Sequence, residues 1–430
     1  MRQHIQRKIT DTSDFKEKLF HWVSQSSSFT ILEGQQMGTI HHQYDCIIGI
    51  GELSSLIFQG QVDFNQLDHY HQKTNDWLLT YISYDVKNSI ENLKSQNSDD
   101  LKFPLLKFIQ PRKLLCLKNN LLSFHYLNDD IQDVEKDFND INKTLVEESS
   151  LPKVDFINRM SKKEYFENAS QLLNHIQRGD IYEVNFCQEF YANDISFDCL
   201  QAYKSLREIS KAPFSVFSKL DSHYVISASP ERYISKSGST LISQPIKGTA
   251  RRDLDPNTDH EIKIKLQNDP KERAENIMIV DLVRNDLSKI AKRKSVTVQE
   301  LCEIYSFEQV HQMISTITCE VSDNLKLSDI LKASFPMGSM TGAPKYKAME
   351  LAEKYETTKR GLYSGSVGYI TPDFDFDFNV VIRSLLYNVD NQYLSYMVGG
   401  ALTSKSVIEK EYEECELKGR AMRKIFGQSS

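Results

Sequence analysis

Cysteine is scarce in this sequence, and its few copies are scattered. The chain of 430 residues has seven cysteines, and no two of them form a C-x-x-C pair. Structural zinc sites and small disulfide-stapled domains both depend on closely spaced cysteines. The spacing therefore excludes a disulfide scaffold and a structural zinc site, and it indicates a protein of a reducing cytoplasm.

Long hydrophobic runs and basic clusters are also missing. The longest apolar stretches, such as residues 277–280, fall far short of the roughly 20 residues that cross a bilayer. The polar start of the chain lacks the apolar stretch of a secretory signal. Lys and Arg number 52 against 59 Asp and Glu, a formal net charge of -7, and no basic stripe is available for phosphate backbones. We therefore expect a cytoplasmic protein that neither crosses a membrane nor binds nucleic acid.

The composition is typical of a large folded chain. Hydrophobic residues make up 40% and charged residues 26%, enough for one large core or two ordinary ones. A charged stretch at residues 129–150 ends at Pro152 and predicts a boundary between an N-terminal region, residues 1–150, and a second region, residues 151–430. Strand-like and helix-like segments do not alternate regularly, which favours an α+β fold with antiparallel sheet over a doubly wound fold.

Three predicted helices share one start signal. A Ser or Asp cap is followed three residues later by Glu, the pattern of a capping box, and these helices cover residues 161–178, 269–286 and 406–425. A further helix is predicted at residues 345–355. Short apolar runs bounded by turn residues predict strands, including residues 28–32, 46–50, 77–82, 182–191, 215–218, 224–228 and 240–245.

Two pairs of glutamates lie three residues apart on predicted helices. Glu272 and Glu275 share one face of the first helix, and Glu411 and Glu414 share one face of the second. Carboxylates from two helices can hold Mg2+ while water and substrate complete its coordination. Ordinary surface charge is the alternative for either pair taken alone.

Lys247 follows a predicted strand and precedes Gly248 and Thr249. An amine beside backbone N–H groups and a hydroxyl can bind an anion or act as a nucleophile. The alternative is a turn with a solvated lysine. A Walker loop is excluded, because the glycines that would precede the lysine are missing.

Two further segments can bind anions. Residues 338–345 form a loop of small residues that opens a helix, and the free N–H groups of a helix start favour an anion. Arg383 lies in an apolar strand, where it needs a carboxylate partner from a substrate or from the chain itself. Cys46 is not a glutaminase nucleophile, because no Gly precedes it; we predict that it is a buried strand residue.

The order of these segments is more specific than any one of them. The motifs run in the order Ser-Pro-Glu-Arg at 229–232, Pro-Ile-Lys-Gly-Thr at 245–249, Lys-Glu-Arg-Ala-Glu-Asn at 271–276, Gly-Ser-Met-Thr-Gly-Ala-Pro-Lys at 338–345, Ser-Gly-Ser-Val-Gly-Tyr at 364–369 and Glu-Tyr-Glu-Glu at 411–414. This series resembles the chorismate-utilising enzymes over residues 157–424. Within that family it is most similar to the aminodeoxychorismate synthases, which aminate chorismate in the 4-aminobenzoate branch of folate synthesis.

Single positions separate the branches of this family. Lys247 stands where anthranilate synthases typically have Ala, and Glu183 stands where isochorismate synthases have a water-activating Lys. The motifs of tryptophan-inhibited members match poorly, so feedback binding of tryptophan is not expected. Anthranilate synthase component I and a non-catalytic chorismate-binding subunit are the alternatives. The intact set of Glu231, Lys247, Glu275 and Glu414 argues against the second of these.

The resemblance also implies a fold, a mechanism and a partner. The fold would be a large two-sheet antiparallel β-sandwich flanked by helices, with the chorismate-binding catalytic region at residues 151–430. Lys247 would attack C2 of chorismate and Glu231 would transfer the proton, while Mg2+ would be held directly by Glu275 and Glu414 and through water by Glu272 and Glu411. The residues that hold the substrate would be Gly248, Thr249, Ser339, Tyr363, Arg383, Gly399 and Gly400. Ammonia would come from a separate glutamine amidotransferase subunit.

Two expectations concern individual side chains. A lysine attacks only when uncharged, so we expect burial or nearby positive charge to lower the pKa of Lys247, with Arg251 and Arg252 as candidate sources. The family often has His where this chain has Gln312, and His311 comes one residue earlier. Because neighbouring residues of a strand face opposite sides, we expect His311 to point away from the pocket.

Overall fold

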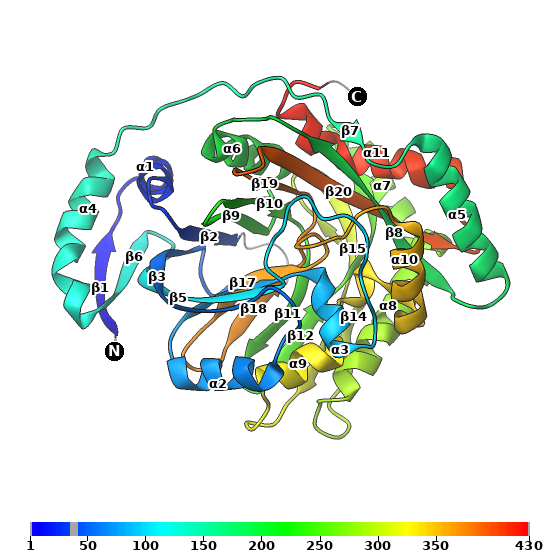
Figure 1. Cartoon of the computed structure of the whole chain (residues 1–430), viewed down its shortest axis with the longest axis horizontal. Coiled ribbons are helices and arrows are strands. Elements are labelled where there is room, and N and C mark those ends of the chain that lie inside the picture. Colours follow the sequence, from blue (N-terminus) through cyan, green and yellow to red (C-terminus); the bar gives the residue numbers. More distant parts are fainter. Residues whose placement is uncertain (1, 35–41, 429–430) are drawn as a thin grey trace.

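Figure 1 shows the computed structural model of the chain, which describes residues 2–34 and 42–428. Hydrogen bonds join the strands of these residues into one 20-stranded sheet. The strands are β1 (Arg2–Lys8), β2 (Phe29–Gly34), β3 (Cys46–Phe58), β4 (Leu78–Ile82), β5 (Leu106–Lys118), β6 (Leu121–Leu127), β7 (Ile157–Asn158), β8 (Glu183–Ala192), β9 (Phe214–Leu220), β10 (His223–Ser229), β11 (Arg232–Ser237), β12 (Thr240–Gln244), β13 (Ile246–Arg251), β14 (Thr297–Ser306), β15 (Val310–Glu320), β16 (Gly342–Ala343), β17 (Ser366–Ile370), β18 (Phe376–Asn379), β19 (Ser384–Asn388) and β20 (Tyr393–Thr403).

Helices pack around this sheet. The α-helices are α1 (Thr12–Ser24), α2 (Phe64–Thr74), α3 (Lys87–Ile90), α4 (Val134–Lys143), α5 (Lys162–Gln177), α6 (Cys199–Ser210), α7 (Pro256–Gln267), α8 (Pro270–Ser288), α9 (Leu327–Ser334), α10 (Lys345–Tyr355) and α11 (Ile408–Lys424). Short 3-10 turns are η1 (Tyr84–Val86), η2 (Asn128–Asp133) and η3 (Gly338–Met340). No helix of the described segments has both the length and the apolar character that a membrane span requires.

The strands form two antiparallel series that meet at β5. One series runs β5, β3, β2, β9, β10, β19, β20, β8. The other runs β5, β4, β17, β18, β11, β12, β15, and β15 also pairs with β13 and β14. The predicted α+β class with antiparallel sheet is confirmed. The two layers, however, are wings of one continuous sheet and not separate sheets.

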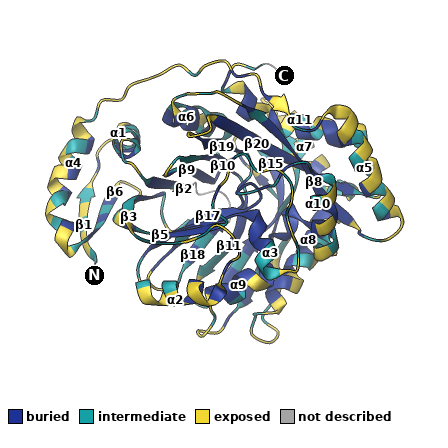
Figure 2. Ribbon diagram, in the orientation of Figure 1, coloured by how far each residue is buried: buried dark blue, intermediate teal, exposed yellow. Residues whose placement is uncertain are grey.

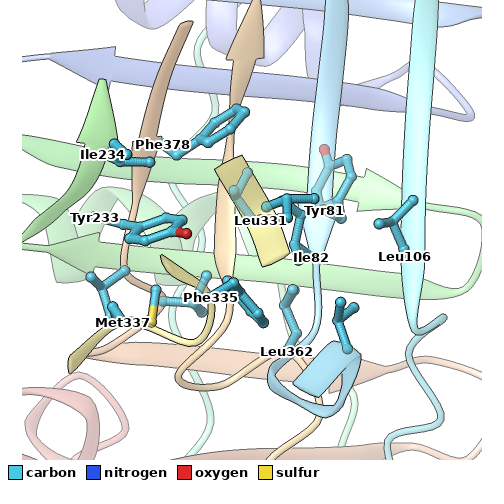
Figure 3. Packing of buried hydrophobic residues seen from close by; sticks show 14 of the residues in the cluster. Tyr81, Ile82, Leu106, Tyr233, Ile234, Leu331, Phe335, Met337, Leu362 and Phe378 are labelled. Atoms are coloured by element: carbon cyan, nitrogen blue, oxygen red, sulfur yellow. The ribbon is translucent and has the colours of Figure 1, made fainter. Parts of the chain in front are cut away.

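A hydrophobic core lies between the two wings. It joins Val225 of β10 and Leu386 of β19 to side chains of the second wing and of α9. Figure 3 shows part of this packing, in which Tyr81, Ile234 and Phe378 lie near Leu331. Helices cover the outer faces: α6 and α11 lie against the first wing, and α8 lies against β13, β14 and β15 (Figure 1). In Figure 2 the helices are exposed on their outward sides while the strands they cover are buried.

Strands from the N-terminal region belong to the same sheet as those of the second region. Strand β2 pairs with β9, and β4 pairs with β17. The predicted boundary near residue 150 falls in an extended segment, residues 144–156, between α4 and β7. The division into two regions stays a prediction from the sequence.

Two of the three predicted helix starts agree with the structure. Ser161 and Glu164 form the capping box of α5, and Asp269 caps α8 by accepting two backbone N–H groups. The predicted cap at Ser406 is wrong. Its hydroxyl accepts the N–H of Thr403 at 3.0 Å, and α11 begins two residues later without a side-chain cap. The Ser406 side chain therefore bonds within the turn after β20 and does not cap α11.

The core makes a simple prediction about stability. Leu331 is fully buried, so Leu331→Ala removes apolar contacts and leaves a cavity. We expect it to lower the free energy of unfolding by about 2–5 kcal/mol, as measured by chemical denaturation. Leu254 is fully exposed, and Leu254→Ala is the control, with an expected change within about 0.5 kcal/mol. Equal effects of the two substitutions would contradict the described core.

Candidate active site

A cavity of about 540 Å³ lies between β13, β20, α8 and α11. The predicted site residues that line it are Glu231, Lys247, Gly248, Thr249, Glu272, Glu275, Ser339, Tyr363, Arg383, Gly399, Glu411 and Glu414. Gly400 does not line it. A side chain at that position would point toward Cys415 and Glu411 of α11, each 3.7 Å away, because successive residues of a strand face opposite sides.

A β-bulge places Lys247 in the cavity. The register of β13 against β15 shifts between Ile246 and Thr249, and bulges re-aim side chains in this way. Gly248 has φ +85°, a conformation that L side chains rarely adopt, and a Cβ there would lie 3.1 Å from Glu272. Glycine is therefore needed next to the lysine both for the backbone turn and for the close approach of α8.

The amine of Lys247 is paired with a carboxylate. Its Nζ lies 2.8 Å from Oε1 of Glu183, and the two side chains are 11% and 1% exposed. Burial alone would lower the pKa of Lys247, but the carboxylates of Glu183 and Glu275 outweigh it, and the pKa is raised. The expected lowering of the Lys247 pKa is therefore wrong, because the two carboxylates outweigh burial. Arg252 is no source of positive charge here, because it pairs with Asp259 at 2.6 Å.

Glu231 is a buried carboxyl group in the same cavity. It is 4% exposed, in the connection between β10 and β11. Burial raises its pKa to about 7, while the hydroxyl of Ser339 and the charge of Lys247 offset part of the effect. A carboxyl group that is partly protonated near neutral pH is suited to donating a proton to a leaving hydroxyl group.

Helices α8 and α11 bring the four predicted metal-ligand carboxylates to one wall. Glu275 is 7% exposed, and burial raises its pKa to about 7, with a further contribution from Glu183. Glu272 also has a raised pKa, from burial and from the charge of Glu414 across the two helices. The cavity therefore concentrates negative charge that its own groups only partly neutralise.

Lysines approach three of these carboxylates. Lys271 Nζ lies 3.1 Å from Glu411 Oε1 and 3.8 Å from Glu275 Oε1, and Lys418 lies 2.7 Å from Glu414. Within residues 2–34 and 42–428, no three acidic, His or Cys side chains already converge on a metal position. Glu275 Oε1 is nevertheless buried without a hydrogen-bond partner. A wall of four carboxylates from two helices, with one carboxylate oxygen that accepts no hydrogen bond, fits Mg2+, which takes few protein ligands and keeps several waters.

Arg383 faces the cavity without an acidic partner. Its Nη1 donates to the carbonyl of Lys418 at 3.2 Å, and no ion pair with an acid is formed within the described part of the chain. The alternative of an internal salt bridge is therefore wrong. Arg383 has φ 53°, a strained conformation of the kind found at binding sites. Tyr363, 3% exposed, lines the same cavity, so the two can hold a carboxylate together.

His311 and Gln312 point as the strand pattern predicts. His311 is buried away from the cavity, where Nε2 lies 3.0 Å from Asp259 and Nδ1 lies 2.9 Å from Ser306. Gln312 lines the cavity, and its buried Oε1 has no hydrogen-bond partner. Cys46 is a buried strand residue, 1% exposed, and burial raises the pKa of its thiol, so its rejection as a nucleophile is supported.

Sequence reasoning gave no role in the site to three residues that belong to it. In the sequence, Glu183 serves only as a position that separates branches of the family. In the structure, its carboxylate binds the amine of Lys247. Lys271 links the two acidic helices, and Lys418 binds the carbonyl of Gly399 at 2.8 Å. The spacing of Glu414 and Lys418, four residues apart on one helix face, was the one available signal.

Most of the chain matches a known family. The family model described as chorismate binding enzyme covers residues 25–424, and the chain therefore belongs to this family. Aminodeoxychorismate synthase component 1 of Escherichia coli is 40% identical over 260 residues, 60% of this chain and 57% of the relative. The match thus spans little more than half of that relative.

Other relatives match over longer stretches. Aminodeoxychorismate synthase component 1 of Bacillus subtilis is 31% identical over 81% of this chain and 76% of the relative. Anthranilate synthase component 1 of Saccharolobus solfataricus is 30% identical over 81% and 80%. The crystal structure of anthranilate synthase component I from Streptococcus pneumoniae superposes with a TM-score of 0.79 at 23% identity, covering 90% of this chain and 94% of the other. This last similarity confirms the anthranilate synthase component I-like fold.

The pairing of Lys247 with Glu183 makes a testable prediction. Glu183→Gln removes the negative charge nearest the ammonium group, so the pKa of Lys247 should fall. Competitive labelling of amines at a series of pH values, read by mass spectrometry, should show Lys247 becoming reactive at lower pH than in the parent protein. Lys271, whose partner Glu411 is intact, serves as the internal control. An unchanged labelling profile for Lys247 would show that Glu183 does not hold its proton.

Proposed function

We propose that this chain is the chorismate-aminating component of an aminodeoxychorismate synthase. The observation that carries the proposal is that the amine of Lys247 lies in one cavity with the carboxyl group of Glu231, whose pKa burial raises to about 7, and with Arg383, which has no acidic partner among the described residues. Chorismate is a dianion with a C4 hydroxyl group, and its amination needs a nucleophile, an acid and groups that bind carboxylates. The relatives named aminodeoxychorismate synthase component 1 support the same assignment.

The proposed reaction has two stages. The amine of Lys247 adds to C2, the ring double bond shifts, and the C4 hydroxyl group leaves as water with the proton of Glu231. Ammonia then adds to C4, the double bond shifts back, and the C2–N bond to Lys247 breaks. The released lysine nitrogen recovers a proton, and the product is 4-amino-4-deoxychorismate.

Lys247 must lose a proton before it attacks. Its Nζ donates to Glu183 at 2.8 Å. Glu183 is then the nearest acceptor for that proton, since it lies within hydrogen-bond distance and is 1% exposed. Transfer of that proton to Glu183 would leave the lysine uncharged and able to attack.

Mg2+ is the proposed cofactor. Glu275 and Glu414 would hold it directly, and Glu272 and Glu411 would hold its water ligands. The bound cation would supply positive charge that pins the ring carboxylate of the substrate and offsets the acidic groups that raise the pKa of Lys247. Tyr363 and Arg383 would bind the enolpyruvyl carboxylate, and Gly248, Thr249, Ser339 and Gly399 would complete the binding surface.

The proposed nitrogen source is ammonia from a separate glutamine amidotransferase subunit. The name component 1 of the relatives implies a partner subunit for those proteins. The one cysteine that resembled a glutaminase nucleophile, Cys46, is buried in β3. We therefore assign glutamine hydrolysis to the partner and amination to this chain.

Anthranilate synthase component I is the second candidate. It is favoured by the relative from Saccharolobus solfataricus, which matches over most of both chains. Against it stands Lys247, at a position where anthranilate synthases typically have Ala. The two assignments differ in whether the lysine bonds to the substrate, so a covalent adduct separates them.

We expect Lys247→Ala to abolish a covalent adduct with chorismate. The parent protein, mixed with chorismate and Mg2+ without ammonium and then denatured, should gain the mass of chorismate less water on the peptide that contains Lys247. Lys247→Ala should gain none, because the two lysines at the acidic wall of the site, Lys271 and Lys418, are paired with Glu411 and Glu414. The exposed Lys265→Ala should behave as the parent. Full adduct formation in Lys247→Ala would refute the nucleophile assignment.

We expect turnover to depend on Mg2+ and on Glu414. Excess chelator should stop chorismate consumption in the parent protein, and added Mg2+ should restore it. Glu414→Ala should lower kcat/KM by about 100-fold or more, because one direct ligand is lost. Glu413→Ala, its exposed neighbour on α11, is the matched control and should have little effect. Unchanged turnover in excess chelator would contradict the proposed requirement for Mg2+.

A further inference from the structure

Arg360 is a fully buried charged group that the proposed reaction does not use. Its side chain is 1% exposed and forms a bidentate ion pair with Glu356, which is 4% exposed. The two bonds run from Nε to Oε2 at 2.9 Å and from Nη2 to Oε1 at 2.6 Å. Neither residue lines the cavity. An ion pair this deep is costly to desolvate and is a weak source of stability, so its position in the fold needs another explanation.

The guanidinium group also binds two backbone segments. Nη1 donates to the carbonyl of Met340 at 2.7 Å, and Nη2 donates to the carbonyl of Asn185 at 2.8 Å. The Glu356 carboxylate accepts the backbone N–H of Cys187 at 2.9 Å. Four of the five N–H groups of the guanidinium fork are thereby used, and the face of the fork lies 4.4 Å from the ring of Tyr84.

Each bonded segment carries a wall of the cavity. Met340 follows Ser339 in η3, and both line the cavity. Asn185 lines it from β8, two residues after the Glu183 that holds Lys247. The backbone carbonyl of Arg360 accepts the N–H of Tyr363 at 3.0 Å, and Tyr363 forms part of a third wall.

We propose that Arg360, with Glu356, is a positioning residue that fixes three walls of the substrate cavity relative to one another. The planar fork is suited to this task, because it holds a carboxylate and two carbonyls in directions set by its geometry. A lysine at this position would keep the charge but could not hold all three acceptors in one plane. The inference rests on the proposed function for its kinetic test, and on the structure alone for its test by hydrogen exchange.

The competing explanation is a purely structural ion pair, and the chain contains a matched control. Arg2 has the same pattern far from the cavity: its Nε bonds both oxygens of Asp76, and its other nitrogens donate to the carbonyls of Pro111, Arg112 and His125. Its side chain is 7% exposed, and it does not line the cavity. Arg2→Lys therefore removes a similar fork without touching the walls.

The experiment compares Arg360→Lys with Arg2→Lys in the full-length protein. Both should lower the thermal unfolding midpoint. At 25 °C, where both are folded, Arg360→Lys should lower kcat/KM for chorismate by at least about tenfold, because displacing a reacting group by about 1 Å costs this much or more. KM should rise because Ser339 and Tyr363, which are proposed to bind the substrate, are displaced. The value of kcat should fall because the Lys247–Glu183 pair is displaced. Arg2→Lys should leave both within twofold.

Hydrogen exchange gives a second measurement that does not need turnover. The backbone amides of Cys187 and Tyr363 should exchange faster in Arg360→Lys and at the parent rate in Arg2→Lys. If Arg360→Lys does not fold, Glu356→Gln keeps the shape of the partner, and the same pattern is expected with a smaller loss. A variant with kcat/KM within twofold of the parent and unchanged exchange at these amides would overturn the proposal. If the parent protein does not consume chorismate, the proposed function fails, while the exchange comparison still decides the role of Arg360.

Discussion

The cavity brings several ionisable side chains together at positions that are largely buried from water. The carboxyl groups of Glu231 and Glu275 line it with little access to water, and burial raises the pKa of both. The ammonium group of Lys247, 2.8 Å from Glu183, offsets part of that effect. A divalent cation would offset the remaining negative charge of the cavity and that of a dianionic substrate. The surrounding structure is arranged to keep these groups close in spite of their mutual repulsion.

The fold supplies that arrangement through local devices that belong to separate elements. A bulge in β13 turns Lys247 inward, α8 and α11 present their acidic faces to one side, and a left-handed residue at Arg383 directs an unpaired guanidinium group to the same space. Strand β8 carries Glu183 on one of its ends. Other walls of the cavity come from β8 and η3, which lie far apart in the sequence, and Arg360 bonds to both; the proposed role of this arginine is to keep their spacing fixed.

Much of this organisation could be predicted from the sequence, because motifs and periodicity are local. The capping box at Ser161, the helix with Glu272 and Glu275 and the inward direction of Gln312 all depend on short-range rules. The errors have two different causes. Ser406 bonds within a local turn, to the N–H of Thr403, and the pKa of Lys247 is raised against the effect of burial by carboxylates that include Glu183, 64 residues away along the chain. No local pattern reports such a partner, so the direction of the shift could not be predicted.

The central claim is that this protein aminates chorismate. The most direct measurement is to incubate the purified protein with chorismate, Mg2+ and ammonium and to identify the product by mass and fragmentation. The account predicts 4-amino-4-deoxychorismate, which retains the enolpyruvyl group, with no release of pyruvate. Anthranilate accompanied by pyruvate, or chorismate left unchanged, would contradict it.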